Sequence, residues 1–446
     1  MPRMLVLSVN AGSSSLKISL YSITRPLENL GDKEPASLLL TSTVSGISSP
    51  PVKFSFRSNN SFEDIATVKD AYVDSIHDHE GAFSHFVQHL QAESSIDPNE
   101  IVHICHRIVH GGDYHDPVII SEETYNHIEN LSDLAPLHNG AALAVIKACI
   151  KDIPSANSIA YFDTAFHRSI PNHIAGYAIN QTIAQKRGLK KYGFHGLSYA
   201  FMLGAVSHFL QRPLGSLNLI LLHLGSGASV CAIKQGKSYD TSMGLTPLSG
   251  LPGATRSGEI DPSLIFHYTN KAGKITHDRG AATNLHVTEA EHILNSQSGW
   301  KALTGTTDFA LITDRVFHSS ASTSTDLPDL EQENAELAFR MFTDRILNYI
   351  GSYYLKLHGQ IDAIVFAGGL GERSAELRKI IGKEVKCLGF HSIDEERNQN
   401  VNEMDGTVVD LSLGNQKGKR ILICRTDEQL EMARQCALEE NFWKED

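Results

Sequence analysis

Residues 6–17 of the chain read VLSVNAGSSSLK, and this stretch decides how the N-terminal part of the protein folds. The apolar run 4–9 is typical of a β-strand, and the run 16–21 resumes the pattern after a turn of small residues. Gly12 permits close backbone approach, three serines follow it, and Lys17 ends the turn. Backbone N–H groups, hydroxyls and a cation together can bind an oxyanion such as phosphate. Taken alone, the stretch is more often an ordinary serine-rich hairpin turn than a phosphate-binding one.

Residues 219–233, LILLHLGSGASVCAI, repeat this strand, turn and strand pattern half a chain later. Aligning Asn10 with His223 places Gly12 on Gly225 and Ser13 on Ser226. The repeat predicts two related α/β lobes that face each other across a cleft, although two hairpins can also resemble each other by chance.

A third segment has the pattern of a nucleotide-binding turn. The apolar run 361–366 leads into AGGLGERS at 367–374, and a helical pattern follows at 375–380. A strand, a glycine-rich turn and a helix in this order bring backbone close to a nucleotide in α/β proteins. A helix entry with a purely structural role would have the same pattern.

Composition excludes several classes of function. The 446 residues are enough for two domains, and the net charge of −12 argues against nucleic-acid or membrane partners. Six scattered cysteines without a CxxC pair favour free thiols in a reducing compartment. No apolar run approaches the ~18 residues of a membrane span, and the run 4–9 is too short for a signal peptide. We therefore expect a cytoplasmic protein.

The remaining pattern predicts where helices and loops lie. Amphipathic helices are expected at 82–91, 140–150, 331–357 and 428–440, the last of them after a strand at 420–424. The polar stretches 41–60 and 319–326 are expected to be surface insertions without chemistry.

Several charged or imidazole side chains adjoin apolar strand patterns, where burial without partners is costly. Arg107 precedes two glycines in HRIVHGG, Asp163 follows an apolar run, and His195 lies between glycines in YGFHG. Arg256 lies in a second glycine-rich loop, and Asn139 has the pattern of a helix N-cap. Each could instead form a structural ion pair or cap. Together, and without a hydrolase, zinc-protease or Walker A motif, they indicate phosphate chemistry.

These motifs together resemble the acetate kinase family, within the superfamily of actin, hexokinase and Hsp70-type phosphotransferases. The motifs NAGSSSLK, HRIVHGG, PLHNG, FDTAFH, YGFHG, HLGSGAS, TPLSGLPGATRSGEIDP and TDEQLEMAR occur in the family's order along nearly the whole chain. The resemblance implies an α/β fold of two duplicated ribonuclease-H-like lobes, with mixed sheets flanked by helices and an active-site cleft between the lobes. Residues 1–164 with about 428–446 would form the N-terminal lobe, and 165–427 the C-terminal lobe with the adenosine site and a dimer interface.

The resemblance also implies a role for each matching residue. The catalytic group would be Asp163, Arg107, Arg256, His195 and His138. ATP or ADP would bind to Asn10, Ser13, Ser15, Lys17, His223, Gly225, Ser226, Gly227, Asp308, Gly369 and Gly371. The acetate pocket would consist of Arg107, Val109, Leu137, Phe194 and Pro247, and Asn10 with Glu428 would position Mg²⁺, with Mn²⁺ as an alternative.

The implied activity is reversible phosphoryl transfer between ATP and acetate, giving acetyl phosphate and ADP in a homodimeric enzyme. The two arginines come from different halves of the chain, so we expect the lobes to close during the cycle. Acetate is already ionised near neutral pH, since its pKa is close to the roughly 4.3 of a glutamate side chain. Asp163 is therefore expected to orient Mg²⁺ or hold an arginine in place.

Three departures from the family pattern fall on the phosphoryl-donor side. Ser226 replaces an asparagine, Arg373 stands where an amide is usual, and Ala310 stands where an arginine is usual. A pyrophosphate-linked enzyme stays open as an alternative for this reason. A propionate or butyrate kinase is the alternative for the acceptor, because one methylene is worth only about 1–3 kcal/mol of discrimination. An Hsp70- or actin-like ATPase scaffold is the alternative from another class.

Overall fold

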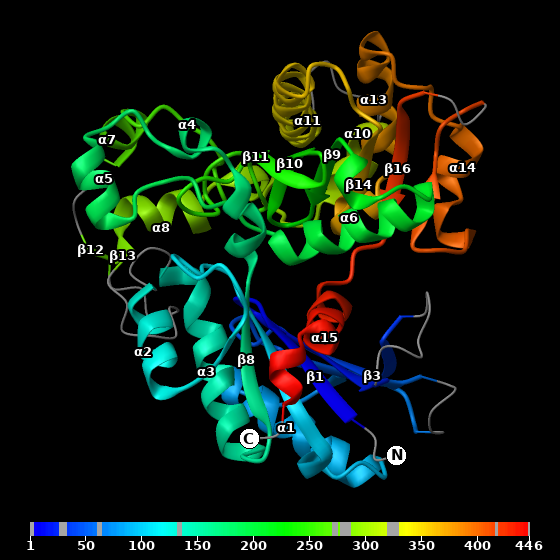
Figure 1. Ribbon diagram of the computed structural model, residues 1–446. Helices are drawn as coiled ribbons and strands as arrows, with labels where there is room; N and C mark the ends of the chain where they lie inside the picture. Colours follow the sequence, from blue (N-terminus) through cyan, green and yellow to red (C-terminus); the bar gives the residue numbers. More distant parts are fainter. Residues whose placement is uncertain are drawn as a thin grey trace. The chain divides into compact units, whose positions relative to one another are not determined.

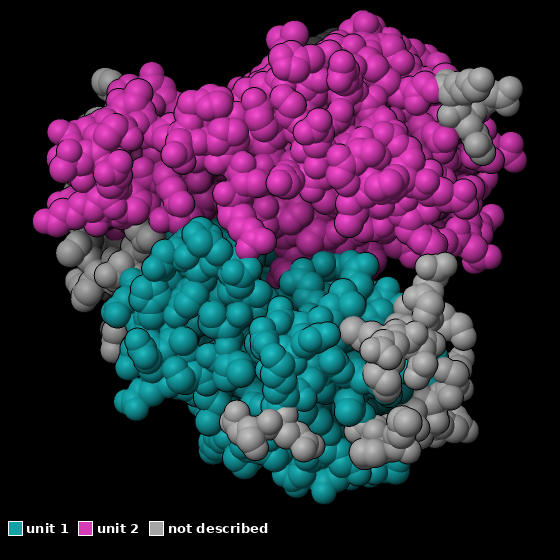
Figure 2. All heavy atoms as spheres, in the orientation of Figure 1, with its two compact units in different colours: residues 1–165, 278–285, 427–446 teal, residues 166–277, 286–426 magenta. Residues whose placement is uncertain are grey.

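The computed structural model describes residues 4–25, 34–59, 65–131, 136–269, 275–276, 287–318, 330–414 and 418–444. These residues form two compact units, coloured separately in Figure 2. Unit 1 contains the described residues of 1–165 and 427–446, and unit 2 those of 166–277 and 286–426.

Unit 1 is built on a mixed sheet whose strands are ordered β5-β4-β3-β2-β1-β6-β8-β7 among the described residues. The strands are β1 Met4–Ala11, β2 Ser15–Ile23, β3 Ala36–Ser45, β4 Lys53–Ser58, β5 Val68–Tyr72, β6 Ile101–Ile108, β7 Val118–Ile119 and β8 Asn157–Phe162. The helices are α1 His79–Glu93, α2 Glu122–Leu131, α3 Pro136–Asp152 and α15 Glu428–Leu438. Strand β1 is buried at every position from Leu5 to Val9. Such continuous burial is typical of a strand covered on both faces, and helices α3 and α15 both contact β1 (Figure 1).

Unit 2 is built on a second mixed sheet with the strand order β11-β10-β9-β14-β16-β15. Its strands are β9 Leu219–Leu224, β10 Ala228–Lys234, β11 Lys237–Thr241, β14 Ala363–Ala367, β15 Val408–Asp410 and β16 Arg420–Cys424, and β12 Ile275–Thr276 pairs separately with β13 Val287–Thr288. Its helices are α4 Asn172–Ala175, α5 Gln181–Arg187, α6 Gly196–Leu210, α7 Leu264–Thr269, α8 Glu289–Ser296, α9 Gly299–Thr304, α10 Phe309–Phe317, α11 Leu330–Lys356, α12 Gly368–Arg373, α13 Ala375–Glu384 and α14 Glu395–Gln399.

The two sheets share one strand arrangement, as the sequence repeat predicts. In unit 1, β1 is antiparallel to β2 and parallel to β6, and β6 is parallel to β8. In unit 2, β9 is antiparallel to β10 and parallel to β14, and β14 is parallel to β16. Asn10 is the penultimate residue of β1 and His223 that of β9, so the sequence alignment of these two residues is confirmed. The predicted α/β class with two mixed sheets flanked by helices is confirmed as well.

The four predicted long helices are present with shifted ends, as α1, α3, α11 and α15. The prediction of a loop insertion at 41–60 is wrong, because this stretch contains the end of β3 and all of β4. Phe54 and Phe56 alternate with polar residues and are buried, at 2 % and 1 % exposure. The many serines mask this strand periodicity in the sequence. The predicted loop at 319–326 lies outside the described residues.

Two local predictions are also corrected. Residues 368–373 of the expected glycine-rich turn form helix α12, which begins at Gly368 with φ +76°. A β-carbon there would lie 2.7 Å from the carbonyl oxygen of Leu224, so only glycine allows this contact with β9. Asn139 is not an N-cap but lies inside α3, and its side-chain amide exchanges hydrogen bonds with the backbone N–H and carbonyl of His110 (3.1 and 3.0 Å).

All six cysteines are free, as expected, and five of them are buried. No helix in the described ranges combines the length and the apolar character that crossing a bilayer requires.

His106 should make unit 1 sensitive to acid. Its ring is 2 % exposed and bonds Ser158 at 3.1 Å, and burial lowers its pKa from 6.5 to about 3. Below pH ~6.5 the His106 imidazole becomes protonated in the unfolded chain but stays neutral in the folded one. The free energy of unfolding therefore decreases as the pH falls toward 3. Between about pH 7 and pH 5 this loss is on the order of 2 kcal/mol.

Urea unfolding of the wild type and of His106→Gln at these two pH values measures the effect. The variant should lose less stability on acidification, whereas the exposed control His208→Gln should behave as the wild type. An identical acid dependence in the wild type and His106→Gln would contradict the assignment.

Candidate active site

Three predicted site residues of unit 1 lie where parallel strands end. Asn10 and Arg107 are penultimate in β1 and β6, and Asp163 directly follows β8. The pairing of Val9 with His106, and of Arg107 with Tyr161, sets these ends side by side. The carboxyl ends of the strands are where open α/β sheets bind ligands.

Glu428, the first residue of α15, completes a cluster around the guanidinium of Arg107. Nε and Nη2 of Arg107 donate to Oδ2 of Asp163 at 3.1 and 2.7 Å, and Nη1 donates to Oε2 of Glu428 at 2.7 Å. The amide of Asn10 donates to the same Glu428 oxygen at 2.7 Å. The resemblance to the acetate kinase family grouped these four residues, and the structure brings all of them together.

The electrostatics of this cluster keep Arg107 charged. Asp163 is fully buried, whereas the Arg107 side chain is 15 % exposed. Burial alone would lower the pKa of Arg107, but the charges of Asp163 and Glu428 outweigh it and raise the pKa above its usual value. The guanidinium is thus a fixed cation with partial access to solvent.

The turn between β1 and β2 is held by hydrogen bonds from His79 and Ser48, which lie outside the hairpin. Gly12 N–H donates to the carbonyl oxygen of Ser15 at 2.8 Å, and His79 at the start of α1 bonds the carbonyl oxygen of Gly12 at 2.7 Å. Ser48 donates its hydroxyl to the carbonyl oxygen of Ser13 at 2.8 Å. Lys17 pairs with Asn10 in the strand register and is exposed. The structure therefore places Ser13, Ser15 and Lys17 at one tip.

In unit 2, His223 of the second hairpin lies beside His195, the residue that precedes helix α6, and both are near an arginine. The rings of His195 and His223 stack with centroids 4.1 Å apart and an interplanar angle of 20°. A β-carbon on Gly227 would lie 3.1 Å from Nη1 of Arg256 and 3.9 Å from Nε2 of His195. These two nitrogens therefore face the same glycine. Burial lowers the pKa of Arg256 from its usual value.

Backbone hydrogen bonds attach the loop of Arg256 to this hairpin. Ala254 N–H donates to the carbonyl oxygen of Ser226 at 2.8 Å, and Gly253 N–H donates to that of Arg256 at 3.0 Å. A β-carbon on Gly253 would approach the Ser226 oxygen to 2.6 Å. The bond from Ala254 uses only backbone of Ser226, so the serine in place of the usual asparagine leaves this attachment intact.

The residues expected on the adenosine side are spread over two helices, α10 and α12. Gly369 and Gly371 lie in α12, and Asp308 caps α10 by accepting from Ala310 N–H at 2.9 Å. Arg373 is exposed at the end of α12. The structure assigns no ligand to these positions, and their roles stay predictions.

The expected acetate pocket is described only in part. Val109 is partly exposed, whereas Phe194 and Pro247 are buried. Leu137 and His138 lie in the first turn of α3, but their side chains are outside the described part of the chain.

The sequence analysis missed a buried arginine, Arg378, that supports helix α12. Arg378 is 1 % exposed and donates to Oδ1 and the carbonyl oxygen of Asn398 and to the carbonyl oxygen of Gly371, at 2.7 to 2.9 Å. Burial lowers its pKa to about 10. Glu372 accepts from the N–H groups of Gly368 and Thr426, at 2.9 and 3.3 Å. The sequence offered one sign of this role, because Arg378 lies on the apolar face of the helix predicted at 375–380.

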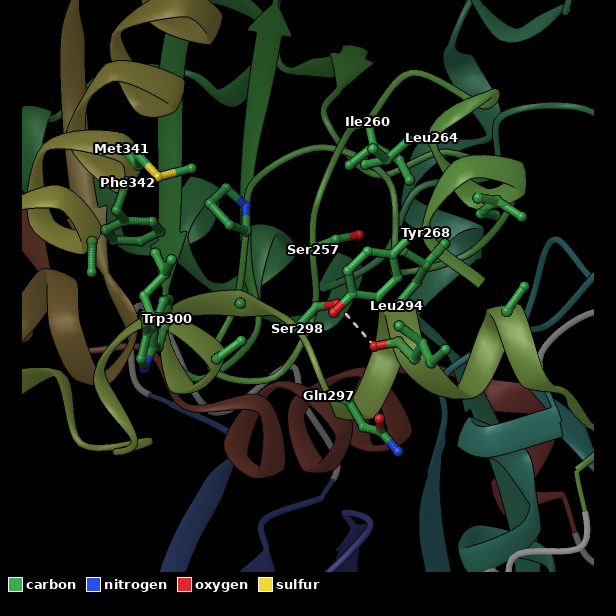
Figure 3. A pocket seen from close by; sticks show the side chains of 18 residues that line it. Ser257, Ile260, Leu264, Tyr268, Leu294, Gln297, Ser298, Trp300, Met341 and Phe342 are labelled. Carbon is green, nitrogen blue, oxygen red and sulfur yellow. Dashed lines mark hydrogen bonds between the residues drawn. The ribbon is translucent and has the colours of Figure 1, made fainter. Parts of the chain in front are cut away.

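A mostly apolar pocket of about 260 Å³ lies beside the loop of Arg256 (Figure 3). Its walls include Ile260, Leu294, Trp300 and Phe342, from that loop and from helices α8, α9 and α11. Ser298 at its edge donates its hydroxyl to the carbonyl oxygen of Ile293 at 2.9 Å. None of the predicted site residues with a described side chain lines this pocket.

Oxygen ligands for a metal are limited in number. No group of three or more His, Cys, Asp or Glu side chains in the described ranges could hold a metal ion. The amide of Asn10 and the carboxylate of Glu428 adjoin each other, however. This set fits Mg²⁺, which typically binds through one or two carboxylates, substrate phosphates and several waters.

Known proteins are similar to this chain in sequence and in fold. The sequence pattern of the acetokinase family matches residues 5–434. The chain belongs to the acetokinase family. Like the other members it is a kinase, a phosphotransferase with a carboxyl group as acceptor. It is 48 % identical over 441 residues to a protein of Emericella nidulans named probable acetate kinase, with 98 % of each chain covered.

Two solved structures resemble this acetokinase along its length. A propionate kinase from Francisella tularensis matches with a TM-score of 0.77 and 30 % identity, covering 97 % of this chain and 98 % of that one. The acetate kinase of Porphyromonas gingivalis matches with a TM-score of 0.74 and 28 % identity, covering 96 % and 98 %.

Gly227→Ala should impair catalysis by crowding Arg256. The new β-carbon would lie 3.1 Å from Nη1, so the guanidinium has to shift by a few tenths of an ångström. A misplacement of about 1 Å can cost about 100-fold in rate, so we expect this smaller shift to reduce kcat by roughly 10-fold. Steady-state kinetics of this variant and of Gly215→Ala, where a β-carbon meets open space, measure the effect. Equal kcat values in the two variants would contradict the placement of Arg256.

Proposed function

We propose that this acetokinase transfers a phosphoryl group reversibly between ATP and acetate, giving acetyl phosphate and ADP. The observation that carries the proposal is the charged guanidinium of Arg107, fixed by Asp163 and Glu428 at the carboxyl ends of parallel strands. A fixed cation with planar donors suits acetate and phosphoryl oxygens alike. The names of the Emericella and Porphyromonas relatives support acetate as the acceptor.

The chemistry requires positioning and charge stabilisation more than proton transfer. Phosphoryl transfer spreads negative charge over three equatorial oxygens in the transition state. We assign Arg107 of unit 1 and Arg256 of unit 2 to that charge, and we assign to His195 a hydrogen bond to a phosphoryl oxygen. His138 and His223 are assigned supporting positions in the same reaction.

Asp163 acts as a positioning group in this proposal. Acetate is ionised at neutral pH, so no general base is needed to generate the nucleophile. Two hydrogen bonds from Arg107 to one oxygen of Asp163 support the role of holding this arginine. The carboxylate also offsets the cost of burying the guanidinium.

Mg²⁺, or Mn²⁺ in its place, would be held by Asn10 and Glu428. When bound, the cation would neutralise phosphate charge. Asn10 donates to Glu428 at 2.7 Å, and Arg107 donates to Glu428 at 2.7 Å and to the amide oxygen of Asn10 at 3.4 Å, so these side chains are oriented in advance.

ATP is the proposed donor. The residues that we propose bind it are Ser13, Ser15, Lys17, Gly225, Ser226, Gly227, Asp308, Gly369 and Gly371. The short pocket expected from Val109, Leu137, Phe194 and Pro247 favours acetate over longer acids. We further infer from the family resemblance a homodimer formed through the C-terminal lobe, testable by light scattering, with its free thiols in the reducing cytoplasm.

A matrix of donors and acceptors tests the proposal. ATP, GTP and pyrophosphate are each assayed with Mg²⁺ against acetate, propionate and butyrate. We expect ATP with acetate to give the highest kcat/KM, and propionate to follow within about 10- to 200-fold. Acyl phosphate is detected as its hydroxamate, so that ATP hydrolysis is not counted. The highest value with propionate would favour the activity for which the Francisella neighbour is named. ATP hydrolysis indifferent to any acid would indicate the scaffold ATPase and overturn the proposal.

Asp163→Asn should remove most of kcat with little change in the KM for acetate. The amide keeps the shape but no longer holds the guanidinium by charge, so Arg107 loses its alignment toward the transition state. We expect a loss of about 100-fold or more, by comparison with mispositioned charge stabilisers elsewhere. The control is Asp152→Asn. The carboxylate of Asp152, at the end of α3, accepts a hydrogen bond from Ser84 of α1. A decrease below about threefold would contradict the positioning role.

A further inference from the structure

The stacked histidines of unit 2 are held by two serines in a reciprocal arrangement. His195 and Ser198 lie at the start of α6, while His223 and Ser229 face each other across the β9–β10 hairpin. Ser229 Oγ is 2.8 Å from Nδ1 of His195, and Ser198 Oγ is 2.7 Å from Nδ1 of His223. Ser198 of the helix thus bonds His223 of the hairpin, and Ser229 of the hairpin bonds His195 at the start of the helix. Helix α6 and β9 are neighbours in the fold (Figure 1).

Both serines are shielded from water. Ser198 and Ser229 are each 0 % exposed, so solvent does not compete for their hydroxyls. The Nδ1 atoms therefore point into the protein. The other ring nitrogen of His195, Nε2, lies on the side of Gly227 and Arg256, 3.9 Å from the position of a Gly227 β-carbon. Which proton this nitrogen carries decides what it can do there.

Tyr199, Ser229 and His195 form a chain of hydrogen bonds, and the tyrosine determines which group donates at each step. The phenol oxygen of Tyr199 is 2.5 Å from Oγ of Ser229, and Tyr199 is fully buried. A phenol is a stronger acid than an alcohol and is therefore the better donor. Ser229 then accepts from Tyr199 and directs its own hydrogen to Nδ1 of His195. An imidazole that accepts at Nδ1 carries its proton at Nε2.

The backbone at His195 supports a functional constraint. Its φ of 58° lies in the left-handed region, which is strained for a residue other than glycine. This conformation starts α6 and sets the ring against His223. Strain of this kind persists where surrounding contacts determine it, and the bond to Ser229 is such a contact.

We propose that Tyr199 and Ser229 are positioning residues that hold His195 as the Nε2–H tautomer, a hydrogen-bond donor beside Arg256. Ser198, which also bonds Oγ1 of Thr426 at 2.8 Å, holds the stacked partner His223 in place. The inference rests on the proposed phosphoryl transfer for its catalytic meaning, since a donor at Nε2 serves a phosphoryl oxygen. The tautomer itself does not depend on that function.

Kinetics test the catalytic meaning. Ser229→Ala should lower kcat about 10- to 100-fold, as loss of an orienting partner does elsewhere, and change the KM values less than about threefold. Tyr199→Phe should lower kcat by a smaller factor. In a Ser229→Ala background Tyr199→Phe should have no further effect, because both act through one chain. Additive losses, or a wild-type kcat in Ser229→Ala, would overturn the proposal.

A matched control separates this role from loss of any buried serine. Ser158→Ala removes another serine–histidine bond, to His106 in unit 1, at 3.1 Å and with both residues buried. We expect this variant to keep kcat within about twofold of the wild type.

The tautomer is measured without substrate, so this test is independent of the proposed function. ¹⁵N NMR of histidine-labelled protein distinguishes a protonated from an unprotonated ring nitrogen, and the spectrum of His195→Gln identifies the His195 signals. The wild type should show a protonated Nε2, and both Ser229→Ala and Tyr199→Phe should show a mixture. A protonated Nδ1 in the wild type, or an unchanged signal in both variants, would refute the chain even if the enzyme is confirmed as an acetate kinase.

Discussion

The ion pairs of Arg107 with Asp163 and Glu428 are the interaction on which unit 1 depends. Removing one partner of a buried ion pair costs about 3–5 kcal/mol, because a charge is left without compensation. Here the three residues come from β6, from the end of β8 and from α15, separated by up to 321 positions. The arginine therefore holds together three elements that the chain order keeps far apart. It is also the group to which we propose that the anionic substrate binds.

The two units use one strand arrangement for different chemistry. In unit 1 the penultimate residue of the first strand is Asn10, which bonds Arg107 and the carboxylate of Glu428. In unit 2 the same position is His223, which stacks on His195 and is held by Ser198. The hairpin glycines Gly12, Gly225 and Gly227 are partly exposed. The repeat thus supplies the geometry, and the side chains at its strand ends determine the chemistry.

The sequence predicted local features well and distant contacts poorly. Both hairpins follow from apolar runs separated by Gly/Ser turns, which are signals within a dozen residues. Strand β4 was missed because its serines hide the alternation of Phe54 and Phe56. The partner of Asn139 is the backbone of His110, 29 positions away, which local patterns do not reveal. The cluster of Arg107 with Glu428 was reachable only through family resemblance, and the hydroxyls around His195 not at all.

The claim that the geometry of the Arg107 guanidinium, and not its charge alone, carries the activity is tested most directly by Arg107→Lys. Lysine keeps the charge but cannot donate to Asp163 and Glu428 with a planar fork. We predict that kcat with ATP and acetate falls at least about 100-fold while the protein stays folded. A folded variant that retains kcat within about threefold of the wild type would contradict the account.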